Sequence, residues 1–522
     1  MSLASLNQTI VRFPMCLAVL LAATAAHAQT PVCDRGDRDW EMETFGIAVP
    51  SPPPVDLSRL PTRLIERHYV GPYRMAAMLA RGDFNALQAH WDEIAALTDR
   101  TEQMRATVRS LDALEKRGMT LLHQAQAWHA RNPQSAAAQL ILATAWKHAA
   151  YEVHRDRYVP ERAGGYFHRP HFRARQALPL VDALLAQGGF YAMAAREVDL
   201  PVRFLLSDAD LDAAWNRYLE LIEFAPHYEW LYLRAAGHAS TPHNPQLREQ
   251  RFAQLRGLAD RLQLPQPHRT TLDQTLEEFV RGTARDPSPQ VWRPYWEARV
   301  KVAPTLANTA GWLDAEHRAG NWTSVIGLAD RMLAMQPHHL RALERKAWAL
   351  RQLNRPRESY EAVFAAMVLG SDWASNEIVQ AHVHGGLGVS VRDFDALYAH
   401  CALGATLGLA SAANCLGSAH TEGFGGAPRN NSVALGWHLI GARGGHASSA
   451  HDLAVLLPRI VNQPEQKQAV ELASAHWVRR AAAHDHAPSQ TRLAARPDWG
   501  LLCLPDNRTW FRKLYQRWFS GE

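Results

Sequence analysis

Two stretches of the chain, residues 386–408 (GLGVSVRDFDALYAHCALGATLG) and 423–445 (GFGGAPRNNSVALGWHLIGARGG), repeat a pattern of small residues at a fixed step of 37. The matched positions are Gly386 and Gly423, Gly388 and Gly425, Arg392 and Arg429, Ala405 and Ala442, and Gly408 and Gly445. A constant period of this length is typical of proteins that stack one structural unit. Such stacks more often hold another molecule than carry out chemistry, so the repeat bears on fold and on function.

The rest of the chain reads as helical. From about residue 60 onward no strand-like alternation appears, and Gly or Pro interrupts the pattern every 12–20 residues, a spacing that suits helical hairpins. Small residues at helix crossings let two helices approach to about 8–10 Å, and loop glycines supply positive φ angles. We therefore predict an all-α fold, an α-solenoid of antiparallel helical hairpins.

The middle of the chain resembles the tetratricopeptide repeat, whose period is 34 residues. The matching positions are Gly320 and Asn354 at the inter-helix turn, Ala347 and Ala366 at the small positions of the two helices, and Pro337 at the closing proline. The resemblance implies helical hairpins over about 306–370.

The last third resembles Sel1-like repeats, which have a Gly-x-Gly loop, a helix ending in Ala-Ala-x-x-Gly, and Ala-x-x-x-Leu-Gly on the next helix. The matching positions are Gly386, Gly388, Ala405, Gly408, Ala412, Leu416, Gly417, Gly423, Gly425, Trp437, Ala442 and Gly445. We expect Trp437 to fill the space between hairpins. After Gly445 the next alanine comes one residue late, at Ala450, which predicts a distorted last copy. The N-terminal half is similar to helical domains of bacterial exported proteins.

The first 28 residues predict export. They combine one arginine, a short apolar core and the ending Ala26-His27-Ala28, the pattern of a secretory signal cleaved after Ala28. The apolar run is shorter than the ~20 residues of a spanning helix. The expected location is periplasmic or secreted.

These observations divide the chain into six segments. They are a signal peptide (1–28), a Pro-rich flexible segment (29–58), a helical domain with weak tetratricopeptide-like hairpins (59–300), tetratricopeptide-like repeats (301–370), Sel1-like repeats (371–460) and C-terminal capping helices (461–522).

Composition and motifs argue against several functions. The formal charge of +5 is spread along the chain, which disfavours a nucleic-acid partner. Histidine pairs such as His382/His384 and His446/His451 are not spaced to share a helix face, so we predict no metal site. The sequence contains no nucleophile elbow, no phosphate-binding loop and no dinucleotide fingerprint, so we predict no cofactor and no enzymatic activity. The alternative is an enzyme with an unrecognised site within 60–240.

Two segments are candidate contact sites. Tyr166, Phe167, His168 and Arg169 combine aromatic and basic side chains, as in a recognition loop for an anionic or glycan partner or in a connector that packs its aromatics. Residues 509–519 form a basic amphipathic pattern that either closes the repeat stack or lies on a membrane surface.

The mature chain would keep four cysteines, and we expect two of them to form a disulfide. Cys401 and Cys415 lie seven residues before and after Gly408, the turn of one hairpin, and both should point into the helix seam. The alternative is two free buried thiols. Cys33 and Cys503 lie at opposite ends of the chain.

The sequence thus predicts an exported, non-enzymatic scaffold. We expect its concave surface to bind a protein, a peptide or a cell-envelope component, and the oligomeric state is left open.

Overall fold

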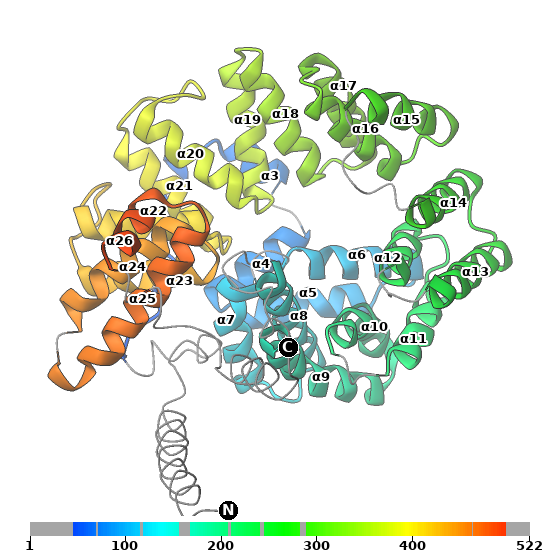
Figure 1. The fold of residues 1–522 in the computed structure, drawn as a ribbon, viewed down its shortest axis with the longest axis horizontal. Coiled ribbons are helices and arrows are strands. Elements are labelled where there is room, and N and C mark those ends of the chain that lie inside the picture. The colour runs from blue at the N-terminus through cyan, green and yellow to red at the C-terminus, as the bar shows by residue number, and fades with distance from the viewer. Residues whose placement is uncertain are drawn as a thin grey trace, which may run out of the picture. The chain divides into compact units, whose positions relative to one another are not determined.

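The structure, a computed structural model, describes residues 45–68, 71–114, 118–155, 168–206, 210–240, 245–281, 289–461, 463–496 and 499. In these residues all regular structure is helical: 24 α-helices, α3 to α26, and two short 3-10 helices, with no strand (Figure 1). The predicted all-α class is confirmed. None of the described helices combines the length and the apolar character that a bilayer span requires.

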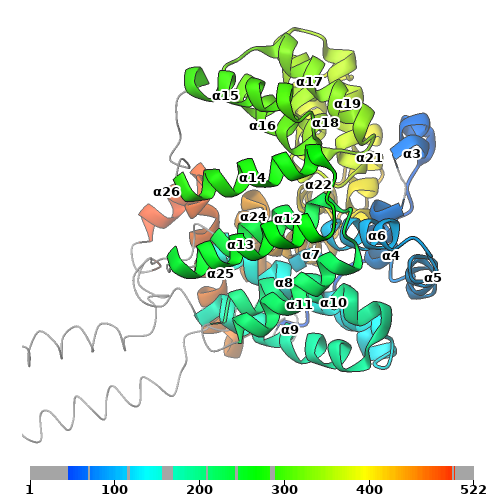
Figure 2. The same ribbon diagram turned by 90° about the vertical axis from the view of Figure 1, so that its right-hand side faces the viewer.

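The described residues form two compact units, one within residues 49–450 and one that joins residues 45–48 with residues 451–499. The first part of the larger unit contains η2 (Leu57–Arg59), α3 (Thr62–His68), α4 (Gly71–Arg81), α5 (Phe84–Ala95), α6 (Arg100–Asp112), α7 (Gly118–Arg131), α8 (Ala136–Arg155), α9 (His168–Gln187), α10 (Gly189–Phe204), α11 (Leu211–Phe224), α12 (Glu229–Ser240), α13 (Pro245–Arg261) and α14 (Gln266–Arg281). Helices α12, α13 and α14 lie side by side (Figure 2).

The second part of the larger unit contains α15 (Pro289–Val302), α16 (Leu306–Arg318), α17 (Trp322–Met335), α18 (Leu340–Gln352), α19 (Pro356–Val368), α20 (Asp372–His384), α21 (Phe394–Thr406), α22 (Ala410–Glu422), α23 (Asn431–Arg443) and the start of α24 (Ala447–Ile460). The smaller unit contains the rest of α24, η3 (Pro464–Gln466), α25 (Lys467–Ala483) and α26 (Ala487–Ala495).

Local sequence signals set the helix boundaries. Asp99 and Asp393 accept hydrogen bonds from backbone amides in the first turns of α6 and α21, and Ser371 does the same for α20. Such caps satisfy amides that have no partner within the helix. The α22 helix ends at Gly423, whose φ of +77° a side chain would strain. The positive φ angle of this glycine therefore sets the position at which the repeat loop begins.

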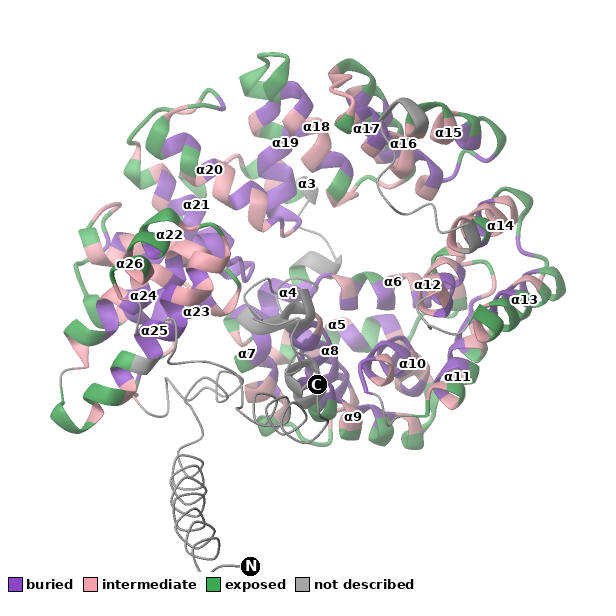
Figure 3. Cartoon of the chain, viewed as in Figure 1, coloured by how far each residue is buried: buried purple, intermediate pink, exposed green. Residues whose placement is uncertain are grey.

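Helices α16, α18, α20 and α22 form one layer of the repeats, which we call the even layer. Each packs against its sequence neighbours, and α16 also contacts α18 while α20 contacts α22. Buried residues alternate with partly buried ones along α16, α18 and α20, and α22 is mostly buried (Figure 3). This is the arrangement of helical hairpins in a stack, in which each hairpin buries its apolar stripe on the next.

Glycines make the closest crossings in the repeats. A Cβ on Gly404 would stand 2.5 Å from Cβ of Ala412, and a Cβ on Gly441, 37 residues later, would meet Ser449. Of the small positions expected to touch, Ala412 lies at this crossing, whereas Ala405 and its repeat equivalent Ala442 lie one residue beyond the glycines and are also buried. Because Ser449 fills the position equivalent to Ala412, α24 keeps the step, and the late Ala450 marks no distortion in this crossing.

The first helices of the larger unit pack on its repeats. Helices α4 and α7 contact α21 and α23, and α3 contacts α19. Ala77 of α4 and Leu60 belong to the same hydrophobic cluster as Trp437. A Cβ on Gly408, whose φ is +75°, would lie 2.8 Å from the Leu121 side chain. The small residues of this hairpin therefore also allow α7 to pack closely against it. A repeat pattern does not predict this contact.

The described end of the predicted Pro-rich segment lies against the same repeats. Pro50 and Pro52 line a cleft of about 20 Å³ together with Leu121 and Trp437. Arg59 forms an ion pair of 3.6 Å with Asp395 at the start of α21. A cleft of this size holds about one water molecule, so it offers no room for a substrate.

Candidate functional site

The structure joins Cys401 and Cys415 in a disulfide. Their sulfurs are at bonding distance and their Cα atoms are 5.9 Å apart. Cys401 lies on α21 and Cys415 on α22, and the exposed fractions of the two residues are 1% and 3%. The bridge therefore fastens one hairpin at its small-residue crossing.

The predicted aromatic and basic contact segment can be located only in part. Tyr166 and Phe167 lie outside the described residues, and so does the amphipathic segment 509–519. His168 and Arg169 open α9, and their side chains are not described. Both segments stay predictions.

Histidines meet across the fold rather than along the sequence. In the smaller unit, Nδ1 of His451 and Nδ1 of His486 hydrogen-bond with the Ser489 hydroxyl at 2.8 and 3.1 Å. In the larger unit the rings of His382 and His400 are 5.2 Å apart. Among the described residues no group of three or more His, Cys, Asp or Glu side chains is placed to hold a metal ion. Neither pair brings the third ligand that a zinc site needs.

Buried neutral histidines predict acid sensitivity. Burial, with a smaller contribution from a neighbouring histidine, lowers the pKa of His400 to about 4 and that of His438 to about 3. In the unfolded chain these rings take up protons near pH 6.5. Stability should thus be complete above pH 6.5 and fall as the pH decreases toward 4, by about 2–3 kcal/mol per ring. Urea unfolding at pH 7 and pH 4.5 would measure this loss, and equal midpoints would contradict it. His400→Leu should reduce the pH dependence.

A buried charge network occupies the region of the alternative enzyme. Glu197 and Asp199 of α10 are 1% and 0% exposed. Arg234 of α12 contacts Glu197 and binds both carboxylate oxygens of Asp112 at 2.6 and 2.7 Å. The Tyr218 hydroxyl donates to Glu197 at 2.9 Å, and burial raises the pKa of this phenol well above its usual value.

The second carboxylate of this network is also held by arginines. Nε of Arg203 donates to Asp199 at 2.6 Å, and Nε of Arg217 donates to its other oxygen at 2.8 Å. Both carboxylates are therefore enclosed by arginine side chains. A general base needs free access to a substrate proton, so this arrangement fits a packing role between α6, α10, α11 and α12.

The exposed face of the even layer carries arginines around a shared acid. Arg341 and Arg345 of α18 both contact Asp314 of α16, the second at 3.2 Å. The Arg341 side chain remains 51% exposed. Partial burial, followed by the charges of Arg345 and Arg318, lowers the pKa of His317 to about 4. The positive charges thus gather where α16 and α18 meet.

Aromatic rings extend this face across the layer. The ring of Trp348 lies 6.2 Å from that of His317 and 6.3 Å from that of Trp373 on α20. The Arg351 guanidinium stacks over Trp348 at 4.5 Å and pairs with Glu377. Trp348 and Trp373 are half-buried. We call these residues, with Asp314, Arg318, Arg341 and Arg345, the even-layer face.

Sequence reasoning did not single out the even-layer face. The residues of this face are spaced along each helix as on any solvent-exposed helix surface. Their spacing therefore does not distinguish them from ordinary exposed residues. The usable signal in the sequence is a tryptophan between arginines within a repeat, Trp348 between Arg345 and Arg351, a combination enriched at binding surfaces.

Comparisons with known proteins yield only structural similarities. No protein-family model matches the chain, and no curated protein matches it. It is similar to a Sel1 repeat protein from Oxalobacter formigenes, with a TM-score of 0.35 and 14% identity, over 66% of this chain and 93% of the other. It is also similar to a protective antigen of uropathogenic Escherichia coli strains that displays an SLR fold, with a TM-score of 0.32 and 15% identity, over 82% and 97%. The repeated hairpins of this chain keep a 37-residue step and cross at glycines.

Proposed function

We propose that this chain is an exported, non-enzymatic scaffold that binds an acidic segment of a protein or peptide through the even-layer face. The observation that carries the proposal is the contact of Arg341 and Arg345 with Asp314, close to the charge of Arg318 and beside half-buried tryptophans. Arginine and tryptophan are the residues that most often dominate binding energy. Their positive charge complements an acidic partner and speeds encounter with it.

Two further observations support a scaffold over the alternative enzyme. The buried acids of α10 are enclosed by arginines, and the cleft beside Leu121 holds about 20 Å³. The α4 and α7 helices cover part of the Sel1-like hairpins. The even-layer face is therefore more open to a partner than the part of the Sel1-like hairpins that α4 and α7 cover.

Binding should depend on the arginines and tryptophan of this face. We expect Arg341→Ala, Arg345→Ala and Trp348→Ala each to weaken binding of the partner by ~1–2 kcal/mol, or about 5- to 30-fold. Partners would be captured from the native cell envelope, identified by mass spectrometry, and titrated against each variant. Arg355→Ala, at the N-cap of α19, is the matched control, because this arginine is exposed and pairs locally with Glu358. Equal affinities for all variants would contradict the proposal.

Export rests on the N-terminal pattern and is tested separately. We expect N-terminal sequencing of the protein from its native host to begin at Gln29. An intact Met1 on the mature product would refute both export and the oxidising environment that a stable disulfide needs.

A further inference from the structure

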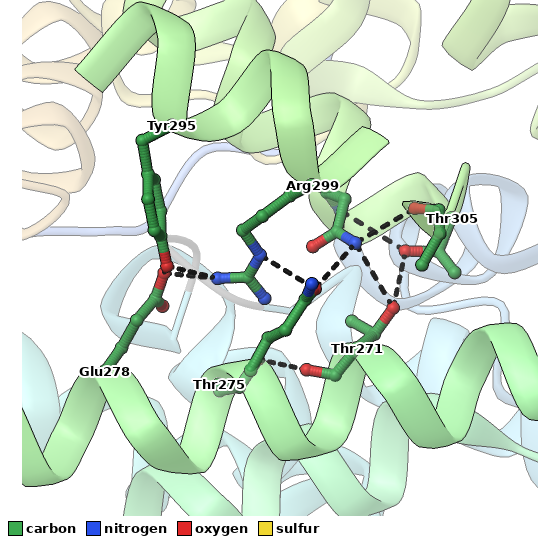
Figure 4. Close-up of polar contacts among 9 residues, drawn as sticks. Thr271, Thr275, Glu278, Tyr295, Arg299 and Thr305 are labelled. Atoms are coloured by element: carbon green, nitrogen blue, oxygen red, sulfur yellow. Dashed lines mark hydrogen bonds and ion pairs between the residues drawn. The ribbon is translucent and has the colours of Figure 1, made fainter. Parts of the chain in front are cut away.

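The contact between α14 and the α15–α16 hairpin is made by polar side chains (Figure 4). The residues that meet are Thr271, Gln274 and Glu278 on α14 and Tyr295, Arg299, Thr305 and Asn308 opposite. We call this contact the polar joint. Two small apolar side chains, Val300 and Ala303, are buried next to this contact, at the C-terminal end of α15.

At one end of the polar joint the amide of Asn308 is shared. Its Nδ2 donates to Thr271 Oγ1 and Gln274 Oε1 at 3.4 Å each and to the Ala303 carbonyl at 2.9 Å. The hydroxyls of Thr271 and Thr305 are 3.1 Å apart. One amide has two protons for these three acceptors, so the bonds to α14 are long and weak.

At the other end a buried arginine contacts three polar side chains. Nε of Arg299 donates to Gln274 Oε1 at 3.0 Å, and its Nη1 contacts Glu278 and the Tyr295 hydroxyl. The side chain of Arg299 is 5% exposed. Burial, followed by the hydrogen bond to Glu278, raises the pKa of Tyr295 to about 12. The phenol therefore stays protonated and can donate.

The same two parts of the larger unit also meet through an apolar contact. Ala77 of α4 and Leu60 share a hydrophobic cluster with residues of α18 to α23, including Leu397. Leu121 of α7 lies against Gly408. We call this contact the apolar joint. On α14 itself, Leu272 and Leu276 belong to the cluster of α11 to α13, on the side away from the polar joint.

The two joints differ in what their separation costs. When a polar joint opens, water replaces each lost hydrogen bond, so the net loss per bond is small. When an apolar joint opens, the exposed area has no such replacement. We propose that the larger unit is a hinged clamp, in which the apolar joint is the pivot and the polar joint opens and closes.

This motion would change how the proposed binding face is presented. The α16 helix carries Asn308 in the polar joint and Asp314 in the even-layer face. Opening of the joint therefore reorients that face relative to α12–α14. The hinge itself needs no ligand, so its test is independent of the proposed function.

Distance measurements between spin labels test the hinge in the full mature chain. Labels would be attached to cysteines in a background with Cys33→Ser and Cys503→Ser, with the native disulfide kept. One pair, Ala253→Cys on α13 and Ser324→Cys on α17, spans the polar joint at exposed positions. A second pair, Glu93→Cys on α5 and Gln380→Cys on α20, reports on the side of the apolar joint. We expect the first distance distribution to be at least twice as wide as the second.

An apolar replacement of the polar joint should close it. Thr271→Val, Thr305→Val and Asn308→Leu together should narrow the first distribution at least twofold and leave the second unchanged. Thr144→Val is the matched control, because the hydroxyl of this buried threonine of α8 donates within its own helix, to the Leu140 carbonyl at 2.8 Å. If the two label pairs give distance distributions of equal width in the protein with the native polar joint, the proposal is wrong, and no variant of the joint is needed to show it. A triple variant that folds but keeps the broad distribution would also overturn it.

Discussion

Replacing Arg234 with alanine is expected to lower the free energy of unfolding by about 3–5 kcal/mol, the cost of leaving a buried charge unpaired. Arg234 is the only described cation that contacts both Glu197 and Asp112. Burial opposes the charge of Arg234, but these two acids outweigh it and hold its pKa well above the usual value. Urea unfolding followed by circular dichroism would measure the change.

The control for this variant is an ion pair of the same chemistry at the surface. Arg261 pairs with Glu223 at 2.5 Å, and its side chain is 63% exposed. Arg261→Ala should cost less than about 1 kcal/mol, because solvent screens exposed pairs. If Arg234→Ala cost no more than this control, the buried network would contribute little to stability.

Loss of the Cys401–Cys415 bridge is the second large expected effect. The bridge closes a separation of 14 residues. By loop entropy its removal should cost roughly 3 kcal/mol at most. Unfolding of the native chain with and without a reducing agent measures this cost without a substitution. Cys401→Ala with Cys415→Ala should abolish the difference between the two conditions.

Peptide mapping under non-reducing conditions provides the direct control. A peptide that joins the two cysteines is expected in the exported protein. Alkylation of Cys401 and Cys415 without prior reduction would show that the thiols are free.

The sequence predicted features that recur at a fixed spacing. The helical class, the hairpins at the 37-residue step and the positive-φ loop glycines follow from local pattern, and the structure confirms them. The pairing of Cys401 with Cys415 could also be predicted, because the turn at Gly408 lies midway between them. In each case the deciding residues are close in sequence.

Contacts between distant residues could not be predicted in this way. Arg234 and Asp112 are 122 positions apart, and nothing in either local sequence identifies the other as its partner. Ser449 replaces alanine at a crossing, and only the approach of Gly441 shows that it fills the same position. The polar joint and the even-layer face likewise combine residues from different helices. Their geometry depends on packing rather than on periodicity.

The contact of Leu121 with Gly408 has a consequence for folding. In an open stack of repeats each unit contacts only its neighbours. The free energy of unfolding is then nearly the sum of contributions from single repeats and their interfaces, and end units can be removed one at a time. Here residues almost 300 positions apart share one core. Closing so long a loop slows folding, because the chain entropy is lost before the contacts form. Truncation after α20 should therefore expose the apolar surfaces of α4 and α7, and the N-terminal helices should lose stability together with the repeats.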